Sequence, residues 1–377
     1  MTRCTLPRRT DTLTSGREPT LDPQEQDAML NELDHLPEGL LDAECHQLDR
    51  VLGAPTLIHL PGAREPALFL SVLMHGNETV GWEAIRGLLR ERLERFGDLR
   101  LPRALSLFIG NVSAAASGVR HLPGQPDYNR VWPGTQLPHT PEHDLMQKVV
   151  RIMADRGLFA SLDLHNNTGL NPHYACVNRV DNRFLNLATL FGRIVVYFTR
   201  PAGVQSLAMA GLCPSVTVEC GKVGEQQGVE HARSFIEAAL HLSRISHHPV
   251  APHDIDLFHT VAQVRVREDV GFGFPPDQAD LVLNPTLEQL NFSELPRGMA
   301  FGRIRVGLGI GLDVRDERGR DVGDRYFQVD DGELRLRQSV MPSMLTRNQV
   351  VIRQDCLCYL MERYSDHLPT GDEPVDA

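Results

Sequence analysis

Short apolar runs alternate with longer amphipathic segments between residues 51 and 245. The short runs have the length of buried strands, and the longer segments repeat apolar residues at helical spacing. This alternation predicts an α/β fold in which helices cover both faces of a sheet. The predicted strands are 56–60, 67–74, 104–110, 160–164, 173–177, 193–198 and 214–219, and the predicted helices are 79–95, 142–156, 181–191 and 228–247.

The same pattern divides the chain into three parts. Residues 1–50 form an N-terminal extension whose first 24 positions are polar and lack periodicity, and residues 25–46 predict a short helix and a turn. Residues 51–248 form the predicted catalytic unit, which ends where Pro249 and Pro252 break the last helix. Short alternating runs beyond this linker predict a smaller β domain over residues 249–377.

Composition narrows the class of protein. The chain has 377 residues and 41% apolar residues, which is enough for a large core. The formal net charge of -11 argues against a nucleic-acid partner, because phosphate binding needs clustered Lys and Arg. Without a signal-peptide pattern or an apolar run near the ~18 residues of a membrane span, we expect a cytoplasmic protein without a membrane partner. The seven cysteines lack Cys-x-x-Cys pairs, so reduced thiols are expected.

A candidate metal site begins directly after the predicted strand 67–74. His75 and Glu78 stand at the spacing His-x-x-Glu, with Gly76 where the backbone must turn and Thr79 where a helix should start. His165 ends another predicted strand and supplies a distant third ligand. Two imidazoles and one carboxylate leave one coordination position for water, which is the arrangement of catalytic Zn²⁺ sites. The alternative is a surface loop that contains an ordinary histidine.

Two carboxylates could serve such a centre. Asp163 lies two residues before His165, so on a strand it shares the histidine's face and can orient an imidazole of the site. Glu219 ends the predicted strand 214–219 and falls where open α/β sheets place their ligands, which makes it a candidate general base. The alternative for both residues is an ordinary polar position on a strand.

Four short motifs occur together in an order that resembles a known family. They are His75-Gly76-Asn77-Glu78, Asp127-Tyr128-Asn129-Arg130, Asp163-Leu164-His165-Asn166-Asn167 and Val218-Glu219-Cys220-Gly221. This order is similar to that of the succinylglutamate desuccinylase and aspartoacylase family, relatives of the zinc carboxypeptidases, over roughly residues 51–245. The resemblance implies a mixed, mostly parallel sheet of carboxypeptidase type and a small C-terminal β domain that partly covers the active site.

The resemblance also implies roles for individual residues. His75, Glu78 and His165 resemble the ligands of one Zn²⁺ ion, and Glu219 resembles the general base and acid. Asn129 and Arg130 look like the pair that holds a substrate carboxylate, for which a planar guanidinium is suited. Arg120 looks like the arginine that polarises the scissile carbonyl, and Asp127 and Asp163 would support the ligands from behind.

Departures from the family pattern leave the substrate open. The segment between Arg120 and Asn129 is about two residues longer than usual, and residues 201–218 lack the expected second carboxylate-binding arginine, for which Arg200 is the nearest substitute. A neutral or larger acyl group is therefore possible. Tyr326 or Arg325 from the C-terminal domain could also reach the site.

The function predicted from the sequence is zinc-dependent hydrolysis of the amide bond of a small N-acyl amino acid that bears a carboxylate. Two alternatives stay open: a carboxypeptidase for small peptides, and a zinc-binding module without catalysis. The sequence leaves the oligomeric state open as well, and a homo-oligomer is one possibility.

Overall fold

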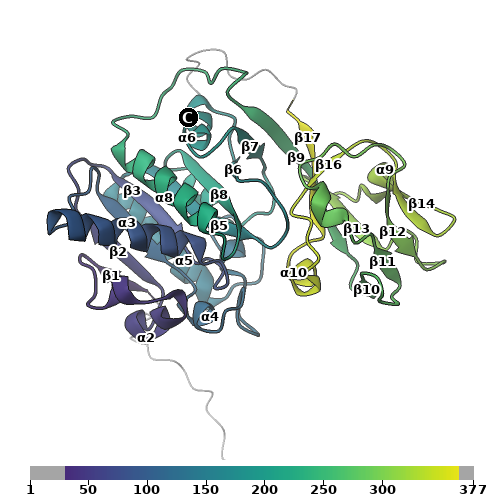
Figure 1. Ribbon diagram of the computed structural model, residues 1–377, viewed down its shortest axis with the longest axis horizontal. Coiled ribbons are helices and arrows are strands. Elements are labelled where there is room, and N and C mark those ends of the chain that lie inside the picture. Colours follow the sequence, from purple (N-terminus) through teal and green to yellow (C-terminus); the bar gives the residue numbers. More distant parts are fainter. Residues whose placement is uncertain (1–29, 365–377) are drawn as a thin grey trace, which may run out of the picture.

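The computed structural model of the protein describes residues 30–364 (Figure 1). The polar first 24 residues therefore lie outside the described part. Of the extension, the described residues begin with a strand and two single-turn 3-10 helices, η2 (Leu40–Asp42) and η3 (Cys45–Gln47), followed by the short helix α2 (Leu48–Leu52). Within residues 25–46, for which a short helix and a turn were predicted, the described part contains only 3-10 turns of helix, and the first α-helix begins at Leu48. Pro37 and the left-handed Gly39 (φ 77°) interrupt the predicted helix.

A twelve-stranded mixed sheet forms the centre of the molecule, and eleven of its strands lie side by side. In spatial order these are β1 (Asn31–Leu33), β2 (Thr56–Leu60), β4 (Leu105–Ile109), β3 (Ala67–Val72), β5 (Leu158–Asn167), β8 (Ser215–Lys222), β6 (Tyr174–Val177), β7 (Ile194–Tyr197), β9 (Asp256–Val266), β17 (Cys358–Arg363) and β16 (Met341–Ser343). The twelfth strand, β13 (Leu312–Asp316), pairs with β9. Strands β4, β3, β5 and β8 are mutually parallel, as expected for the catalytic part of the sheet.

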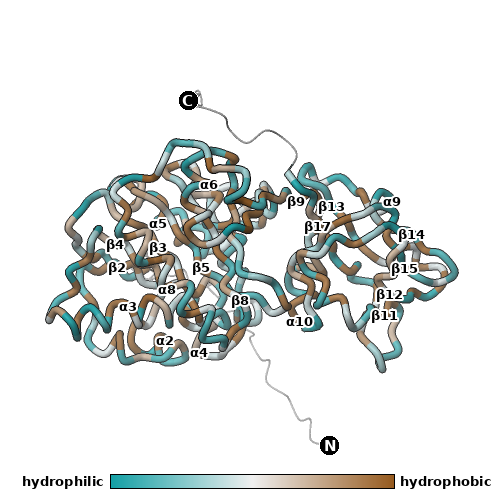
Figure 2. Tube along the Cα trace, turned by 45° about the horizontal axis from the view of Figure 1, so that its top comes forward, coloured by the Kyte–Doolittle hydropathy of each residue, from teal (hydrophilic) through white to brown (hydrophobic). Residues whose placement is uncertain are grey.

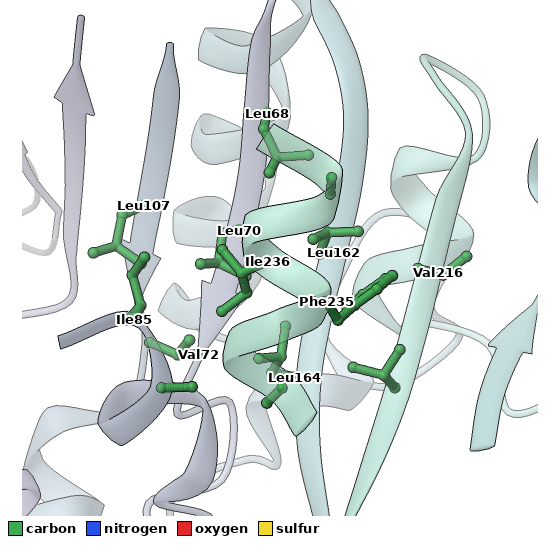
Figure 3. Close-up of a cluster of buried hydrophobic side chains, with 14 of the residues drawn as sticks. Leu68, Leu70, Val72, Ile85, Leu107, Leu162, Leu164, Val216, Phe235 and Ile236 are labelled. Carbon is green, nitrogen blue, oxygen red and sulfur yellow. The ribbon is translucent and has the colours of Figure 1, made fainter. Parts of the chain in front are cut away.

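Helices cover both faces of this sheet because successive residues of each central strand point to opposite sides. Leu68 and Leu70 of β3 face the helices α3 (Val80–Phe96) and α8 (Gln226–His241), whereas Phe69 packs with α5 (Pro141–Arg156) on the opposite side. Figure 3 shows the first of these faces, where Phe235 and Ile236 of α8 lie over the strand side chains. The predicted α/β fold is confirmed.

A second, smaller sheet lies beside the first one (Figures 1 and 2). Its five strands are, in spatial order, β10 (Phe272–Gly273), β11 (Leu281–Leu283), β12 (Ala300–Ile304), β15 (Glu333–Leu336) and β14 (Phe327–Asp330). Short helices η5 (Leu287–Leu290), α9 (Gly323–Tyr326) and α10 (Gln349–Gln354) belong to the same part of the chain. This part has its own hydrophobic core.

The eleven-residue strand β9 connects the two parts. Its residues from Asp256 to His259 pair with β7, those from Ala262 to Val266 pair with β13, and those from Phe258 to Val264 pair with β17. The large sheet therefore continues past the proline linker near residue 250 into the C-terminal part. The sequence pattern indicated a boundary there, because it shows where a helix ends but not which strands pair across the break.

Further short elements escaped the sequence pattern. These are α4 (Val112–Ala116), the single-turn helix η4 (Tyr128–Arg130) and α7 (Gln205–Met209), whereas α6 (Asn182–Thr189) lies within the predicted helix 181–191. None of the helices in residues 30–364 is long and apolar enough to cross a membrane.

Two glycines, Gly76 in the β3–α3 turn and Gly87 within α3, test the packing of the turn. A Cβ atom at Gly76 would lie 2.2 Å from the backbone nitrogen of Ala115, whereas a Cβ at Gly87 in α3 would meet nothing within 4 Å. We expect Gly76→Ala to lower the free energy of unfolding by more than about 2 kcal/mol, because backbone atoms must move. Gly87→Ala should be neutral or stabilise the helix by up to about 1 kcal/mol. Denaturant unfolding would measure both, and equal stabilities would contradict the packing.

Candidate active site

Three parallel neighbours, β3, β5 and β8, bring the candidate residues to one edge of the sheet. Ser71 of β3 is paired with Asp163 of β5, and His165 of β5 is paired with Glu219 of β8. His75 and Glu78 follow in the turn after β3. Because the carboxyl ends of parallel strands meet at the same edge, residues distant in the chain converge there.

The turn after β3 is held in an uncommon backbone conformation. Leu73 has a φ of 57°, which is rare for a leucine, and the amide of Gly76 donates to the carbonyl of Arg120 at 3.1 Å. The next helix begins at Val80, whose amide donates to Oδ1 of Asn166 at 3.1 Å. Thr79 takes the position before the helix, as predicted. The side chain that caps the helix, however, is that of Asn166 at the end of β5.

His75, Glu78 and His165 converge as a buried group. Nδ1 of His75 lies 2.7 Å from Oε1 of Glu78, and Nδ1 of His165 lies 2.7 Å from Oε2 of the same carboxylate. One ligand atom from each residue lies within 4.8 Å of the others, and the two imidazole centroids are 5.0 Å apart. Such a cluster, buried at a sheet edge, is compatible with a shared metal ion.

Carboxylates also hold the outer nitrogen of each imidazole. Nε2 of His75 lies 3.0 Å from Oδ1 of Asp127, and Nε2 of His165 lies 2.9 Å from Oδ2 of Asp163. The hydroxyl of Ser71 donates to the other oxygen of Asp163 at 2.7 Å. Both rings are therefore fixed with their Nδ1 atoms facing Glu78, as in metal sites where a carboxylate orients the ligand histidine.

Protonation supports the assignment of a cation to this group. A neutral imidazole has a single N–H, yet both nitrogens of each ring face carboxylate oxygens. Burial and Arg120 would lower the pKa of His75, but Glu78 and Asp127 outweigh them and raise it. Burial alone would raise the pKa of Glu78, but the two histidines lower it well below the usual range. The cluster thus favours positive charge between the rings and Glu78, and its two nitrogen ligands and one oxygen ligand fit Zn²⁺.

Glu219 lies beside this group without a partner for one of its oxygens. Its side chain is 7% exposed, and Oε2 is a buried atom without a hydrogen bond among the described residues. Burial raises the pKa of Glu219 to about 7, although the charge of His165 pulls it down. A carboxyl group with such a pKa can both accept and release a proton near neutral pH.

Two arginines and two aspartates form an ion-pair chain at the side of the cavity. Nε and Nη2 of Arg120 donate to Asp127 at 3.0 and 2.8 Å, and Nη1 lies 3.7 Å from Glu78. Nη2 of Arg130 donates to Oδ1 of Asp355 at 2.7 Å. Asp355 also lies 3.6 Å from Arg120, so it contacts both arginines. The sequence did not single out Asp355, because nothing near it marks a site.

Asn129 lines the cavity, and its side-chain amide also contacts other residues of the protein. Its Oδ1 accepts from the amide of Gln205 at 2.9 Å, and its Nδ2 lies 3.1 Å from Nε2 of His165. Both ends of the amide are used inside the protein, so Asn129 supports His165. Arg130, the other member of the expected pair, has its guanidinium directed to Asp355 and to the carbonyl of Asn129. Arg120 does reach the centre, despite the longer segment that follows it.

The cavity in front of these residues encloses, with its open mouth, about 980 Å³. The C-terminal part of the chain contributes to its wall through Thr260, Ser343, Met344, Val351, Asp355, Cys356 and Tyr359. Tyr326 and Arg325 do not line it: Tyr326 belongs to the second hydrophobic core, and Arg325 pairs with Glu362. The sequence left open whether these two residues reach the site; both lie in helix α9, away from the cavity wall.

Fold and site together define an α/β protein with a candidate metal centre at the edge of a mixed sheet. Residues 64–246 match the family model described as the succinylglutamate desuccinylase/aspartoacylase catalytic domain. The family that the four motifs indicated is thereby confirmed for this segment of the chain. No curated protein matches the chain in sequence.

Solved structures show the same fold over most of the chain. The succinylglutamate desuccinylase of Vibrio parahaemolyticus is 15% identical with a TM-score of 0.54, covering 81% of this chain and 86% of its own. That of Chromobacterium violaceum is 18% identical with a TM-score of 0.51 and the same two coverages, 81% and 86%. Murine aminoacylase 3 is 16% identical with a TM-score of 0.51, covering 80% of this chain and 97% of its own.

The residue behind His165 provides a test of metal binding. We expect Asp163→Asn to weaken the affinity for Zn²⁺ by 10- to 100-fold, on the order of other changes behind a ligand histidine, because the amide is a poorer acceptor for the ring N–H. Competition with a chromophoric chelator would measure the affinity. Asp144→Asn is the matched control, since Asp144 lies 3.1 Å from Nε2 of the exposed His139. Equal affinities for all three proteins would contradict the assignment.

A second test uses the unpartnered carboxylate. Because the pKa of Glu219 is raised from 4.5 to about 7, the folded protein binds more protons than the unfolded chain between these pH values, and stability falls as pH rises through the window. Glutamine does not titrate. In metal-free protein, Glu219→Gln should therefore gain on the order of 3 kcal/mol over wild type between pH 4.5 and pH 8. Denaturant unfolding at both pH values would measure the gain, with the exposed Glu230→Gln as the control. A difference that does not change with pH would overturn this account of Glu219.

Proposed function

We propose that the protein is a zinc-dependent hydrolase that cleaves the amide bond of a small N-acyl amino acid. The observation that carries the proposal is the unpartnered carboxylate of Glu219 beside the buried His75, Glu78 and His165. The family match supports it, and so do the structures of similar fold, which include succinylglutamate desuccinylases and an aminoacylase.

The three ligand residues would hold Zn²⁺, which supplies a Lewis acid and lowers the pKa of a bound water to about 7. Glu219 accepts a proton from the attacking water at Oε2 and delivers it to the nitrogen of the departing amine. Arg120 stabilises the negative charge that develops on the carbonyl oxygen, since its Nη1 lies beside Glu78. Asp127 and Asp163 keep the two imidazoles in place during the reaction.

The cost of Glu219 argues for catalysis over a silent metal-binding module. A buried carboxyl group with an unpartnered oxygen destabilises the folded protein, and a module that only binds a metal would gain nothing from it. Natural proteins tolerate such costs mainly where function requires them.

The proposal predicts that Glu219→Gln lowers kcat by roughly 10²- to 10⁴-fold, the usual contribution of general acid–base catalysis, while one Zn²⁺ per chain is retained. Glu230→Gln on the exposed side of α8 is the control and should keep full activity. Activity would be measured on N-acyl amino acids and their neutral derivatives, on dipeptides and on γ-glutamyl peptides, with metal content determined in parallel. Faster cleavage of the dipeptides would favour the carboxypeptidase alternative. Unchanged turnover in Glu219→Gln would exclude this residue as the base.

A further inference from the structure

Arg130 is the residue expected to hold a substrate carboxylate, but a carboxylate of the protein already occupies it. Oδ1 of Asp355 accepts from its Nη2 at 2.7 Å, and the carbonyl of Asn129 accepts from Nη1 at 2.8 Å. Both side chains line the cavity, and Asp355 is 9% exposed. Two acceptors of the protein thus take two of the five N–H donors of Arg130, and one of these acceptors is a carboxylate of the cavity wall.

The backbone holds Asp355 in this place. Its amide donates to the carbonyl of Val351 at 2.9 Å at the end of α10, and the amide of Leu357 donates to the carbonyl of Val264 at 2.8 Å. Cys358, one residue further, is already paired with Val264 in the large sheet. Asp355 therefore stands between a helix end and a strand whose register is fixed, and it belongs to the permanent wall of the cavity.

The charges at this wall are balanced without a substrate. Arg120 and Arg130 contribute two positive charges, and Asp127 and Asp355 contribute two negative charges that contact them. Arg130 lowers the pKa of the buried Asp355 against the effect of burial, so this carboxyl group stays ionised. A substrate carboxylate beside Arg130 would face the carboxylate of Asp355 across a short distance, or it would have to displace that carboxylate and leave it only the longer contact of 3.6 Å with Arg120.

Arg200 is the third arginine that lines the cavity, and it differs from the other two. It is exposed, and its Nε donates to the backbone carbonyl of Glu317 at 3.1 Å. The inner wall beside the metal ligands is therefore electrically balanced, and this cation stands nearer to solvent.

We propose that Asp355 determines specificity by making the Arg130 position accept the amino-acid half of the substrate as a neutral carboxamide and not as a free carboxylate. A carboxamide complements the pair: its oxygen accepts from the guanidinium of Arg130, and its NH₂ group donates to Asp355. This inference rests on the proposed function and specifies its substrate class as N-acyl amino acid amides.

Matched substrate pairs test the proposal. The zinc-loaded protein would be assayed with N-acetyl and N-succinyl derivatives of alanine, leucine and glutamate, each as free acid and as carboxamide. Wild type should show a kcat/KM at least 10-fold higher for the carboxamides. Asp355→Ala should reverse this preference, because it frees the guanidinium of Arg130 for a carboxylate. Asp355→Asn keeps the side-chain shape and should raise kcat/KM for the acids at least 10-fold. Asp269→Asn is the control, since it changes an exposed aspartate that pairs with Arg267 on the surface.

Binding gives a second readout that does not depend on turnover. Calorimetry on Glu219→Gln protein should give a Kd at least 10-fold lower for the carboxamide of each pair, and adding Asp355→Ala should reverse the order. Equal or stronger binding and cleavage of the free acids by protein that retains the wild-type Asp355 would overturn this inference while leaving the proposed hydrolase intact. If neither member of any pair is cleaved, the proposed function fails, and the order of the Kd values still decides the role of Asp355.

Discussion

The register of three parallel strands is the constraint on which the site depends. Side chains alternate between the two faces of a strand, so a slip of one residue between β5 and β8 would turn His165 and Glu219 to opposite faces. The paired positions Ser71–Asp163 and His165–Glu219 fix that register. A slip would also move Leu162 and Leu164 out of the apolar core under α3 and α8 and turn Asp163 into it, which opposes the slip.

Charge is arranged in two layers around the proposed centre. Each ligand imidazole has a carboxylate at its outer nitrogen, and the arginines beside them have carboxylates of their own. Glu219 is the acidic side chain in the cavity wall that has an unpartnered oxygen among the described residues. Because the other carboxylates of the site are paired with imidazoles or arginines, burial has the largest effect on the pKa of Glu219. One carboxyl group can thus exchange protons near neutral pH while its neighbours stay ionised.

Much of the fold followed from local patterns. The predicted strand 56–60 has the bounds of β2, and the predicted helices 79–95 and 142–156 match α3 and α5 within one residue. Hydrophobic periodicity determines such elements, because each buries one face. The convergence of His75, Glu78 and His165 was predictable too, since each follows or ends a parallel strand. The contact between Arg130 and Asp355 was not, because it spans 225 residues and depends on how two parts of the chain pack. The orientation of Asn129 was not predictable for the same reason, since its Oδ1 accepts from the amide of the distant Gln205.

The shared strand β9 has a consequence for how the protein can be divided. A fragment that ended at the proline linker would expose the hydrogen-bonding edge of β7, and such unpaired edges invite aggregation. It would also lack the outer wall of the cavity, including Asp355 and Tyr359. The segment that matches the family model therefore does not form the complete cavity, and gene fusions or truncations should keep the two halves together.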